Sequence, residues 1–360
     1  PEADRGAGEQ DQEGKAAQPA DGNERGVEKN EGGKTITIME YRVETTYGYG
    51  NAQALKIASD ISSLDLSDAE DILFDFTKYS ENNPFSNLLI ANSIRTFRKN
   101  HKNKCQLKPN GASYLSHLGF YQMIGADYGK QLGEARASDN YVPITKVTFN
   151  GDFYQTIEDK SEKLAALLKF DKELSLFLKY LFIETIRNTY EHADIGEVYL
   201  SAQKWPSKSL LEIAISDTGC GISNSLRKYR PYSDKDEKEL IKLSCEPGVS
   251  SRSNYRYLEK DNVWRNSGYG LYLMRKLAVA YGGSFLICSG NYALRENKEG
   301  IKIFNTAYEG TTIAIRVKTD KICNFEEVRS KIVFVGEKAS SDAETSIHSA
   351  SKSSGGHYKH

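Results

Sequence analysis

The sequence is poor in cysteine and in long apolar runs. Its five cysteines are scattered, are odd in number and form no CxxC pair, so we expect neither a metal site built on cysteine nor a disulfide framework. No apolar run approaches the roughly 18–20 residues of a membrane span, and nothing near the start resembles a signal peptide. These absences favour a cytoplasmic protein without a membrane segment.

An excess of charge of one sign is also missing. Lysine and arginine together number 48 against 49 for aspartate and glutamate, which gives a net charge of −1. Without a basic excess, the composition does not indicate a nucleic-acid partner. The chain is 39% hydrophobic and 27% charged, and its 360 residues suffice for two domains with cores of their own.

Both ends of the chain have little that could be buried. Residues 1–34 contain no aromatic residue and a single branched aliphatic one, Val27. Such a segment cannot bury enough apolar surface to offset the entropy lost on ordering, so we predict a disordered tail there. Residues 337–360 are rich in Ser, Gly, Lys and His, and they predict a second disordered tail.

Between the tails, periodicity divides the chain into two blocks. In the first block, residues 35–150, the pattern predicts a strand at 35–46, a helix at 51–63, a buried strand at 72–77 and a helix at 87–100. This alternation is typical of a small α/β domain. In the second block, residues 151–330, it predicts helices at 158–169, 171–193 and 268–281, and strands at 197–203, 210–216, 284–290 and 311–317. Late strands beside helices predict an α+β sandwich with helices on one face of a mixed sheet.

The helix predicted over residues 171–193 places three polar residues at intervals of four. Glu184, Asn188 and His192 therefore lie on one face of that helix. The spacing by itself fits either a solvated polar face or the wall of an active site.

A carboxylate and two glycines follow the strand at 210–216. Asp217 comes directly after the strand, and Gly219 and Gly221 come next. A carboxylate fixed at a strand end can accept a hydrogen bond from an exocyclic amine, and glycines let the backbone turn and approach a flat ligand closely. Taken alone, the motif fits a tight turn equally well.

Two further motifs lie toward the end of the second block. Gly268, Tyr269 and Gly270 precede an amphipathic helix, whose free amides and dipole could bind phosphates. This is no Walker A loop, because no GKS/T follows, and it is a poor Rossmann fingerprint, because no strand leads into it. Gly310 and Thr311 begin the last strand, where the Thr311 hydroxyl could support the carboxylate at the other strand end.

In this order, the four motifs together resemble the Bergerat-fold (GHKL) ATPases, the superfamily of histidine kinases, type II topoisomerases, mismatch-repair ATPases and heat-shock chaperones. The resemblance covers residues 160–320. It implies that Asn188 coordinates a Mg²⁺ ion that bridges the phosphates of ATP, and that Glu184 positions or activates the attacking group. Phosphoryl transfer consists mostly of positioning and charge stabilisation around Mg²⁺, so these residue types suit the chemistry.

The same resemblance assigns the rest of the nucleotide site. It implies that Asp217 hydrogen-bonds the adenine amine, that Gly219 and Gly221 shape the base pocket, and that Thr311 supports the adenine end. The phosphates would lie against Gly268, Tyr269, Gly270 and Leu271. The polar stretch 223–266 stands where the family has its mobile ATP lid, and four of its cations could reach the phosphates: Arg252, Arg256, Lys260 and Arg265.

Within the superfamily, we expect a compact module. After Val317 the sequence runs only to His360, which leaves no room for the further domain of topoisomerases, mismatch-repair ATPases and chaperones. His101 and His117 are not followed by the acidic residue and proline of a histidine-kinase phosphoacceptor site. The resemblance then favours the anti-sigma-factor serine kinases.

The first block shows a weaker resemblance of its own. Residues 72–95, ILFDFTKYSENNPFSNLLIANSIR, resemble the central strand, loop and helix of STAS domains, in which anti-sigma-type kinases phosphorylate a serine at the helix start. Ser86 lies near that place, although the Ser–Ser–Gly signature is absent. An ordinary helix N-cap is the alternative interpretation of Ser86.

The sequence therefore predicts a STAS-like α/β domain followed by a Bergerat-fold ATP-binding domain. We expect it to bind Mg-ATP and, through lid closure coupled to hydrolysis or phosphotransfer, to switch its interaction with an unidentified protein partner. Two alternatives stay open: a protein serine/threonine kinase of the anti-sigma type, and a nucleotide sensor without turnover. The carboxylate of Glu184 favours chemistry over sensing. Modules of this kind often dimerise.

Overall fold

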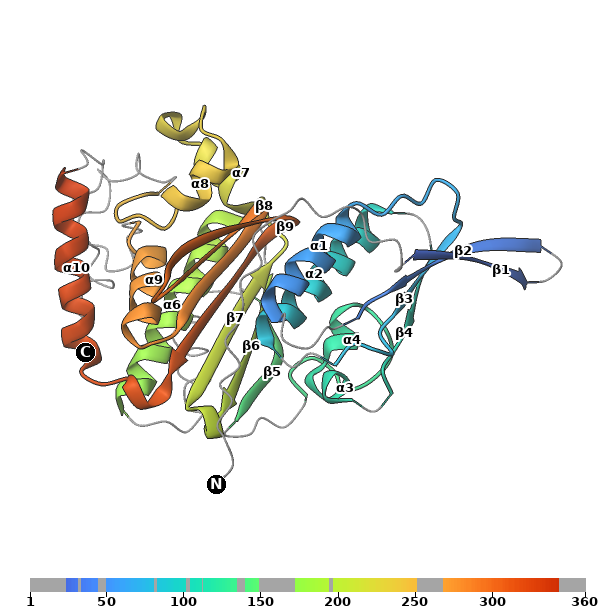
Figure 1. Cartoon of the computed structure of the whole chain (residues 1–360), viewed down its shortest axis with the longest axis horizontal. Helices are drawn as coiled ribbons and strands as arrows, with labels where there is room; N and C mark the ends of the chain where they lie inside the picture. Colours follow the sequence, from blue (N-terminus) through green and yellow to red (C-terminus); the bar gives the residue numbers. More distant parts are fainter. Residues whose placement is uncertain are drawn as a thin grey trace, which may run out of the picture.

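The computed structural model describes most of both predicted blocks and contains two β-sheets (Figure 1). The described residues are 24–31, 34–44, 50–80, 83–101, 104–111, 113–134, 140–148, 172–193, 197–250 and 268–342. The predicted helix at 158–169 lies outside them. In the described part of the chain, no helix is both long enough and apolar enough to cross a membrane.

The first sheet has four strands in the order β1-β2-β3-β4. Its strands are β1 (Glu24–Glu31), β2 (Lys34–Arg42), β3 (Asp71–Asp75) and β4 (Lys104–Lys108). The strands β2, β3 and β4 are parallel. Parallel neighbours need crossover connections, which are supplied by the helices α1 (Gly50–Ser62) and α2 (Pro84–Asn100). The predicted α/β alternation is thus present.

The strand β1 corrects the prediction of a disordered tail over residues 1–34. It pairs antiparallel with β2 along its whole length, from Glu24 opposite Tyr41 to Glu31 opposite Lys34. Strand pairing uses backbone hydrogen bonds, so a polar segment with little apolar surface can still extend the edge of an existing sheet.

The second sheet has five strands in the order β5-β6-β7-β9-β8. They are β5 (Tyr141–Thr148), β6 (Glu197–Trp205), β7 (Leu210–Asp217), β8 (Ser284–Asn297) and β9 (Gly300–Lys318). All neighbours are antiparallel, so the α+β sandwich is confirmed but the predicted mixed sheet is wrong. In addition, β5 pairs with β6, so this strand belongs with the second sheet although the predicted boundary at residue 150 assigns it to the first domain.

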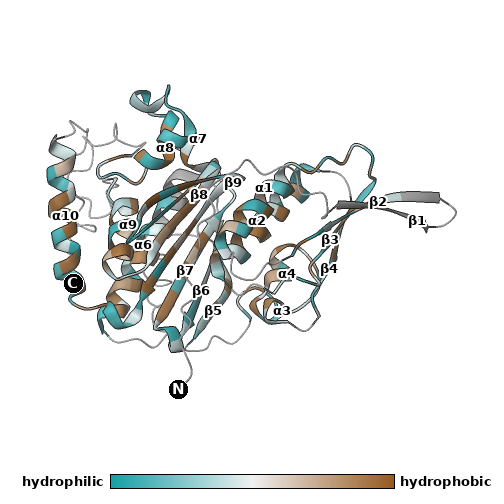
Figure 2. Cartoon of the chain, viewed as in Figure 1, coloured by the Kyte–Doolittle hydropathy of each residue, from teal (hydrophilic) through white to brown (hydrophobic). Residues whose placement is uncertain are grey.

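Helices cover both faces of the second sheet, whereas the sequence predicted them on one. The helices α6 (Lys172–Ala193) and α9 (Gly270–Ala280) pack on one face. The helices α1 and α2 pack on the other, so they lie between the two sheets (Figure 1). Apolar residues run along the five-stranded sheet and along α2 beside it (Figure 2). The α/β region and the sandwich therefore share a core.

The side chains of β7 alternate between these two faces. Leu211, Ile213 and Ile215 belong to the core under α6 and α9. Glu212 and Ser216 instead contact α2, because Glu212 accepts a hydrogen bond from the backbone of Phe85 and Ser216 accepts one from Asn92. With this period of two, Asp217 at the strand end faces the α6 side.

The helix α10 (Phe325–Asp342) follows the last strand and packs on α9. A Cβ atom added to Gly336 would lie 2.6 Å from Tyr272 Cε1, so a glycine is what allows the two helices to approach this closely. The helix continues to Asp342, so the tail predicted over 337–360 begins within an ordered helix.

Candidate functional site

The start of α9 lies directly against the polar face of α6. Gly270 is the first residue of α9. A Cβ atom added there would lie 2.6 Å from Glu184 Oε2 and 3.1 Å from Asn188 Nδ2. Only glycine leaves room for both side chains, so the structure brings together three of the predicted site residues at a helix N-terminus, where free amides favour an anion.

These two side chains are held inside the protein. Glu184 is fully buried, and Asn188 is partly buried. Within the described residues, Asn188 Nδ2 is a buried polar atom without a hydrogen-bond partner. A buried amide in this state costs free energy unless a ligand or water satisfies it. The donor set, a carboxylate and a carboxamide oxygen beside helix amides, fits a hydrated Mg²⁺ ion and a phosphate chain.

The predicted lid, residues 223–266, is described only up to residue 250, where it contains most of α7 (Gly221–Arg227) and the whole of α8 (Glu237–Leu243). The residues on either side of 251–267, which hold the rest of the lid, meet beside the start of α9. Gly248 N donates a hydrogen bond to Gly268 O over 3.2 Å. Gly268 has φ +71°, and a Cβ atom there would lie 2.5 Å from Val249 O, so this junction needs glycine. The described residues that flank 251–267 therefore lie together, close to the start of α9.

The four lid cations that could reach the phosphates lie outside the described part of the chain. These are Arg252, Arg256, Lys260 and Arg265, and the side chain of His192 also lies outside it.

The side chains of Tyr269 and Leu271 point away from the glycines that flank them. Tyr269 is fully buried, packs edge-on against Tyr272 at 6.2 Å, and lies close to Gly336 of α10. Burial raises the pKa of its hydroxyl. Leu271 packs partly buried against the core under α9. At these two positions, therefore, the backbone is the part available to a phosphate.

Asp217 ends β7 at the opposite end of the candidate site. Its Oδ1 atom accepts hydrogen bonds from Gly219 N at 2.8 Å and Thr311 N at 3.2 Å. Thr311 thus supports the carboxyl as predicted, but with its backbone amide in place of its hydroxyl, because the two residues are opposite each other in the β7–β9 pairing. Both bonds end on Oδ1, which leaves Oδ2 for a ligand.

The environment of Asp217 alters its ionisation. The residue is 3% exposed, and burial raises the pKa of the carboxyl to about 7, while the amides of Gly219 and Thr311 act in the opposite direction. The group is therefore close to half ionised at neutral pH, and a ligand that donates a hydrogen bond to it favours the charged form.

A serine that the sequence did not single out fixes the glycine turn. Ser289 Oγ accepts a hydrogen bond from Ile222 N at 2.9 Å and donates one to Gly310 O at 2.7 Å. Gly221 has φ +75°, and a Cβ atom there would lie 2.9 Å from Ser289 Oγ. Nothing in the local sequence SFLICSG marks this serine, because its partners lie elsewhere in the chain, in the helix α7 and in β9.

A buried polar network joins α2 to the same carboxyl-bearing residue. Asn92 Nδ2 donates to Ser216 Oγ at 2.7 Å, and Ser216 Oγ lies 2.6 Å from Thr312 Oγ1 and 2.9 Å from the Tyr308 hydroxyl. The Tyr308 hydroxyl in turn donates to Asp217 O at 2.7 Å. Burial raises the pKa of Tyr308. In the sequence, the one signal of this network is a polar residue, Asn92, within the apolar helix predicted over residues 87–100.

Ser86 is neither exposed nor a helix cap. Asn83 is the N-cap of α2 and accepts a hydrogen bond from Ser86 N at 3.3 Å, with Pro84 at the first helical position. The N-cap interpretation of Ser86 is therefore wrong. Ser86 is 1% exposed, which places its hydroxyl out of reach of another protein in this structure.

Comparison with known proteins agrees with this geometry over part of the chain. The family model described as histidine kinase-, DNA gyrase B- and HSP90-like ATPase matches residues 173–321. The matched region runs from α6 to the end of β9, and it contains both the Gly270 and the Asp217 ends of the site. No curated protein and no solved structure matches the chain.

The chain thus contains an ATPase domain of this family, and the GHKL resemblance of the second block is confirmed. Such a domain implies ATP binding. The STAS likeness of the first block stays a prediction, although the parallel α/β region itself is present.

Proposed function

We propose that this domain binds Mg-ATP between Asp217 and the start of α9 and hydrolyses it. The observation that carries the proposal is the contact of Gly270 with both Glu184 and Asn188, at the helix start where phosphates bind best. Asp217 Oδ2 accepts the hydrogen bond from the adenine amine, while Oδ1 stays on its two backbone amides.

The groups at the phosphate end have separate roles. The backbone amides that open α9 hold the phosphates, and Asn188 supplies an oxygen ligand to the metal. Mg²⁺, when bound, neutralises charge on the phosphate oxygens. Glu184, fixed by burial against α9, orients the attacking water and accepts its proton.

We also propose a regulatory role, which the position of the lid supports. Gly248 and Gly268 flank residues 251–267, which hold the rest of the lid, and meet beside the phosphate end. This contact supports a change of this surface when nucleotide binds. We propose that this change controls the binding of a protein partner. Phosphorylation of the chain's own Ser86 is disfavoured, because that side chain is buried. The kinase alternative therefore requires a separate substrate protein.

Incubation with γ-labelled ATP distinguishes the three activities. We expect release of labelled phosphate by the wild type, loss of release in Glu184→Gln, and loss of both binding and release in Asp217→Asn. Glu212→Gln is the matched control, since Glu212 is an equally buried carboxylate on the other face of the same sheet.

The other possible outcomes of this experiment support one of the two alternatives or refute the proposal. Transfer of label to an added protein, lost in Glu184→Gln, would establish the kinase alternative. Tight ATP binding without release or transfer would establish the sensor. Failure of the wild type to bind ATP would refute the proposal.

A further inference from the structure

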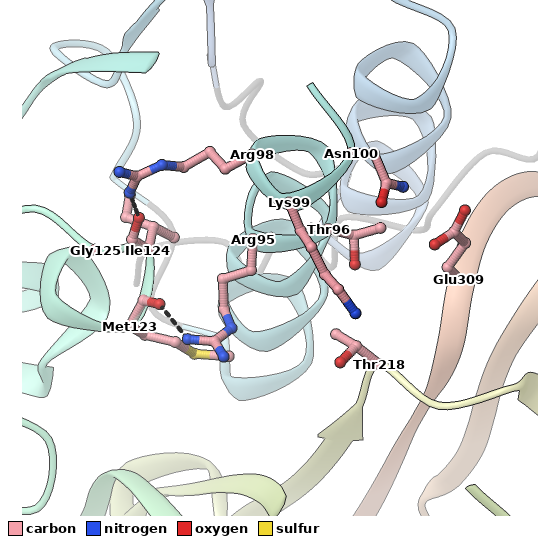
Figure 3. Close-up of a pocket in the computed structure, with 10 residues that line it drawn as sticks. All are labelled: Arg95, Thr96, Arg98, Lys99, Asn100, Met123, Ile124, Gly125, Thr218 and Glu309. Carbon is pink, nitrogen blue, oxygen red and sulfur yellow. Dashed lines mark hydrogen bonds between the residues drawn. The ribbon is translucent and has the colours of Figure 1, made fainter. Parts of the chain in front are cut away.

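A second hollow lies on the α2 side of the five-stranded sheet, on the opposite face from α6 and α9. It has a volume of about 390 Å³ and lies between the last turn of α2, the segment Met123–Gly125, and the residues that follow β7 (Figure 3). Thr218 and Glu309 line it from the sheet side. Thr218 directly follows Asp217, so the two sites are adjacent along the backbone.

The lining of this cavity is strongly basic. Arg95, Arg98 and Lys99 come from one turn of α2, and Glu309 is the carboxylate opposite them. In the described part of the chain, Arg98 and Lys99 form no ion pair with any carboxylate. Cations in the last turn of a helix are common because they complement its dipole. Here, however, Lys99 extends across the cavity toward Thr218, as Figure 3 shows.

Backbone carbonyl oxygens hold both guanidinium groups in place. Arg95 Nη1 donates to Met123 O at 2.9 Å and lies 4.7 Å from the centre of the Tyr199 ring. Arg98 Nη1 donates to Ile124 O. For Arg98, the carbonyl oxygen fixes the direction of the guanidinium group without neutralising its charge. A fixed positive charge at the wall of a cavity is what an anion site requires.

A glycine makes room for one of these groups. Gly125 has φ +82°, and a Cβ atom there would lie 2.4 Å from Arg98 Nη1. Any other residue would displace the guanidinium from the cavity wall. The arrangement of Arg98 is thus built into the backbone of the segment that faces α2.

The size of the cavity and its surroundings define the class of ligand. About 390 Å³ lies within the range of small-molecule sites and suits a molecule of mononucleotide size. A smaller adjoining hollow of about 90 Å³ shares Thr96, Asn100 and Glu309 with it, and is lined by the rings of His101 and Tyr308. We propose that this cavity binds a phosphate-bearing small molecule, with the phosphate on Arg95, Arg98 and Lys99.

Binding here would affect the ATPase site through two contacts. The ligand touches Thr218, the neighbour of Asp217, and Glu309, the neighbour of Gly310. A Cβ atom on Gly310 would lie 2.2 Å from Asp217 O, which shows how tightly these two segments pack. Only this effect on ATP affinity rests on the proposed function; binding of the ligand itself does not.

Calorimetric titration of the full chain with inorganic pyrophosphate and with AMP tests the proposal. The titrations use an Asn188→Ala, Asp217→Asn background without Mg²⁺, which weakens binding at the ATPase site, and the cavity substitutions identify the signal that belongs to the cavity. We expect binding of pyrophosphate, tighter binding of AMP if its ring enters the adjoining hollow, and a loss of about 10-fold or more in affinity in Arg98→Gln and in Lys99→Gln. Lys331→Gln is the matched control, because it removes the same charge from an exposed lysine of α10.

Three results would overturn the proposal. These are equal weakening by Lys331→Gln, no effect of either cavity substitution, and binding of an acidic peptide such as polyglutamate in place of both small anions. Failure of the ATPase proposal gives a different pattern, since the wild type would then bind pyrophosphate at the cavity and no ATP at the family site. Gly125→Ala is a second variant that keeps every charge, and we expect it to weaken pyrophosphate binding as Arg98→Gln does.

Discussion

Replacing Asp217 by asparagine should make the protein more stable at neutral and alkaline pH. The carboxyl has an ordinary pKa of 3.8, and burial raises its pKa to about 7 in the folded protein. Between pH 4 and 7, the folded state therefore keeps a proton that the unfolded chain has released, and the free energy of unfolding falls as pH rises. Each pH unit in this window costs about 1.4 kcal/mol, so the wild type loses about 4 kcal/mol by pH 7 and nothing below pH 4.

Asparagine avoids this loss without disturbing the hydrogen bonds of the site. Its Oδ1 can accept from the amides of Gly219 and Thr311, as the carboxyl oxygen does at 2.8 and 3.2 Å, and it does not ionise. Urea unfolding of nucleotide-free wild type and Asp217→Asn at pH 4.5, 6, 7 and 8.5 measures the difference. It should be small at pH 4.5, grow to about 4 kcal/mol at pH 7 and then stay constant.

Other titrating groups cancel in this comparison. Asp75 has its pKa held at about 2 by hydrogen bonds from Lys108 and Thr77, against the effect of its burial, and its contribution to stability is lost only as pH falls through 4 toward 2. That contribution is the same in both proteins. A difference that is flat across the whole range, or that grows as pH falls, would refute this account of Asp217.

The same ionisation governs ATP binding. The adenine amine donates a hydrogen bond to the carboxylate, so binding below pH 7 requires loss of the proton from Asp217, and ATP affinity of the wild type should fall about tenfold per pH unit there. In Asp217→Asn, the adenine amine would meet either the side-chain NH2 group, which is itself a donor, or the side-chain oxygen, which already accepts two backbone hydrogen bonds. Addition of ATP should therefore leave the free energy of unfolding of this variant unchanged. The residue thus lowers the stability of the empty protein while serving recognition.

Two further substitutions test the packing around the site. Gly270→Ala should lower the ATPase rate on the order of 100-fold, because the new Cβ would lie 2.6 Å from Glu184 Oε2 and must displace it. The control Gly26→Ala, at a position with open space, should leave the rate unchanged. Equal rates in the two variants would contradict the proposed role of α9. Glu212→Ala should cost about 3 kcal/mol in urea unfolding, since it removes a buried carboxylate that accepts hydrogen bonds from Phe85 N at 3.0 Å and Arg316 Nε at 2.8 Å. A cost below about 1 kcal/mol would contradict this.

The parts of the site that could be predicted are those encoded by local spacing. Glu184 and Asn188 are one helical turn apart, and GYG marks a helix start, so each motif is visible without the fold. Ser289 and Tyr308 could not be found in this way. They reach the Asp217 turn through hydrogen bonds set by the pairing of β8 and β9 with their neighbours, and pairing partners are not visible in one strand's sequence.

The largest error in the predicted fold concerned the position of α2. The pattern at 87–100 predicts one helix of a separate small domain. In the structure its buried residues occur on all sides, from Phe85 through Asn92 to Phe97. A helix that is apolar around its whole circumference is buried on more than one face, and that was the available signal for a second sheet against it. The strands β8 and β9 are longer than the predicted strands at 284–290 and 311–317. No sequence signal indicates this extension, because the hairpin carries polar residues beyond the core.

The burial of α2 limits how nucleotide binding can be transmitted to the rest of the protein. A region joined by a flexible linker could move as a unit, but α2 packs between two sheets, and Glu212 and Ser216 of β7 hold it by hydrogen bonds. Close packing transmits small displacements and resists large ones. The same strand ends in Asp217 on its opposite face. Nucleotide binding can therefore affect the rest of the protein in two ways, by moving the lid or by a small shift of β7 that displaces α2. The shared core excludes a rigid-body rotation of the α/β region.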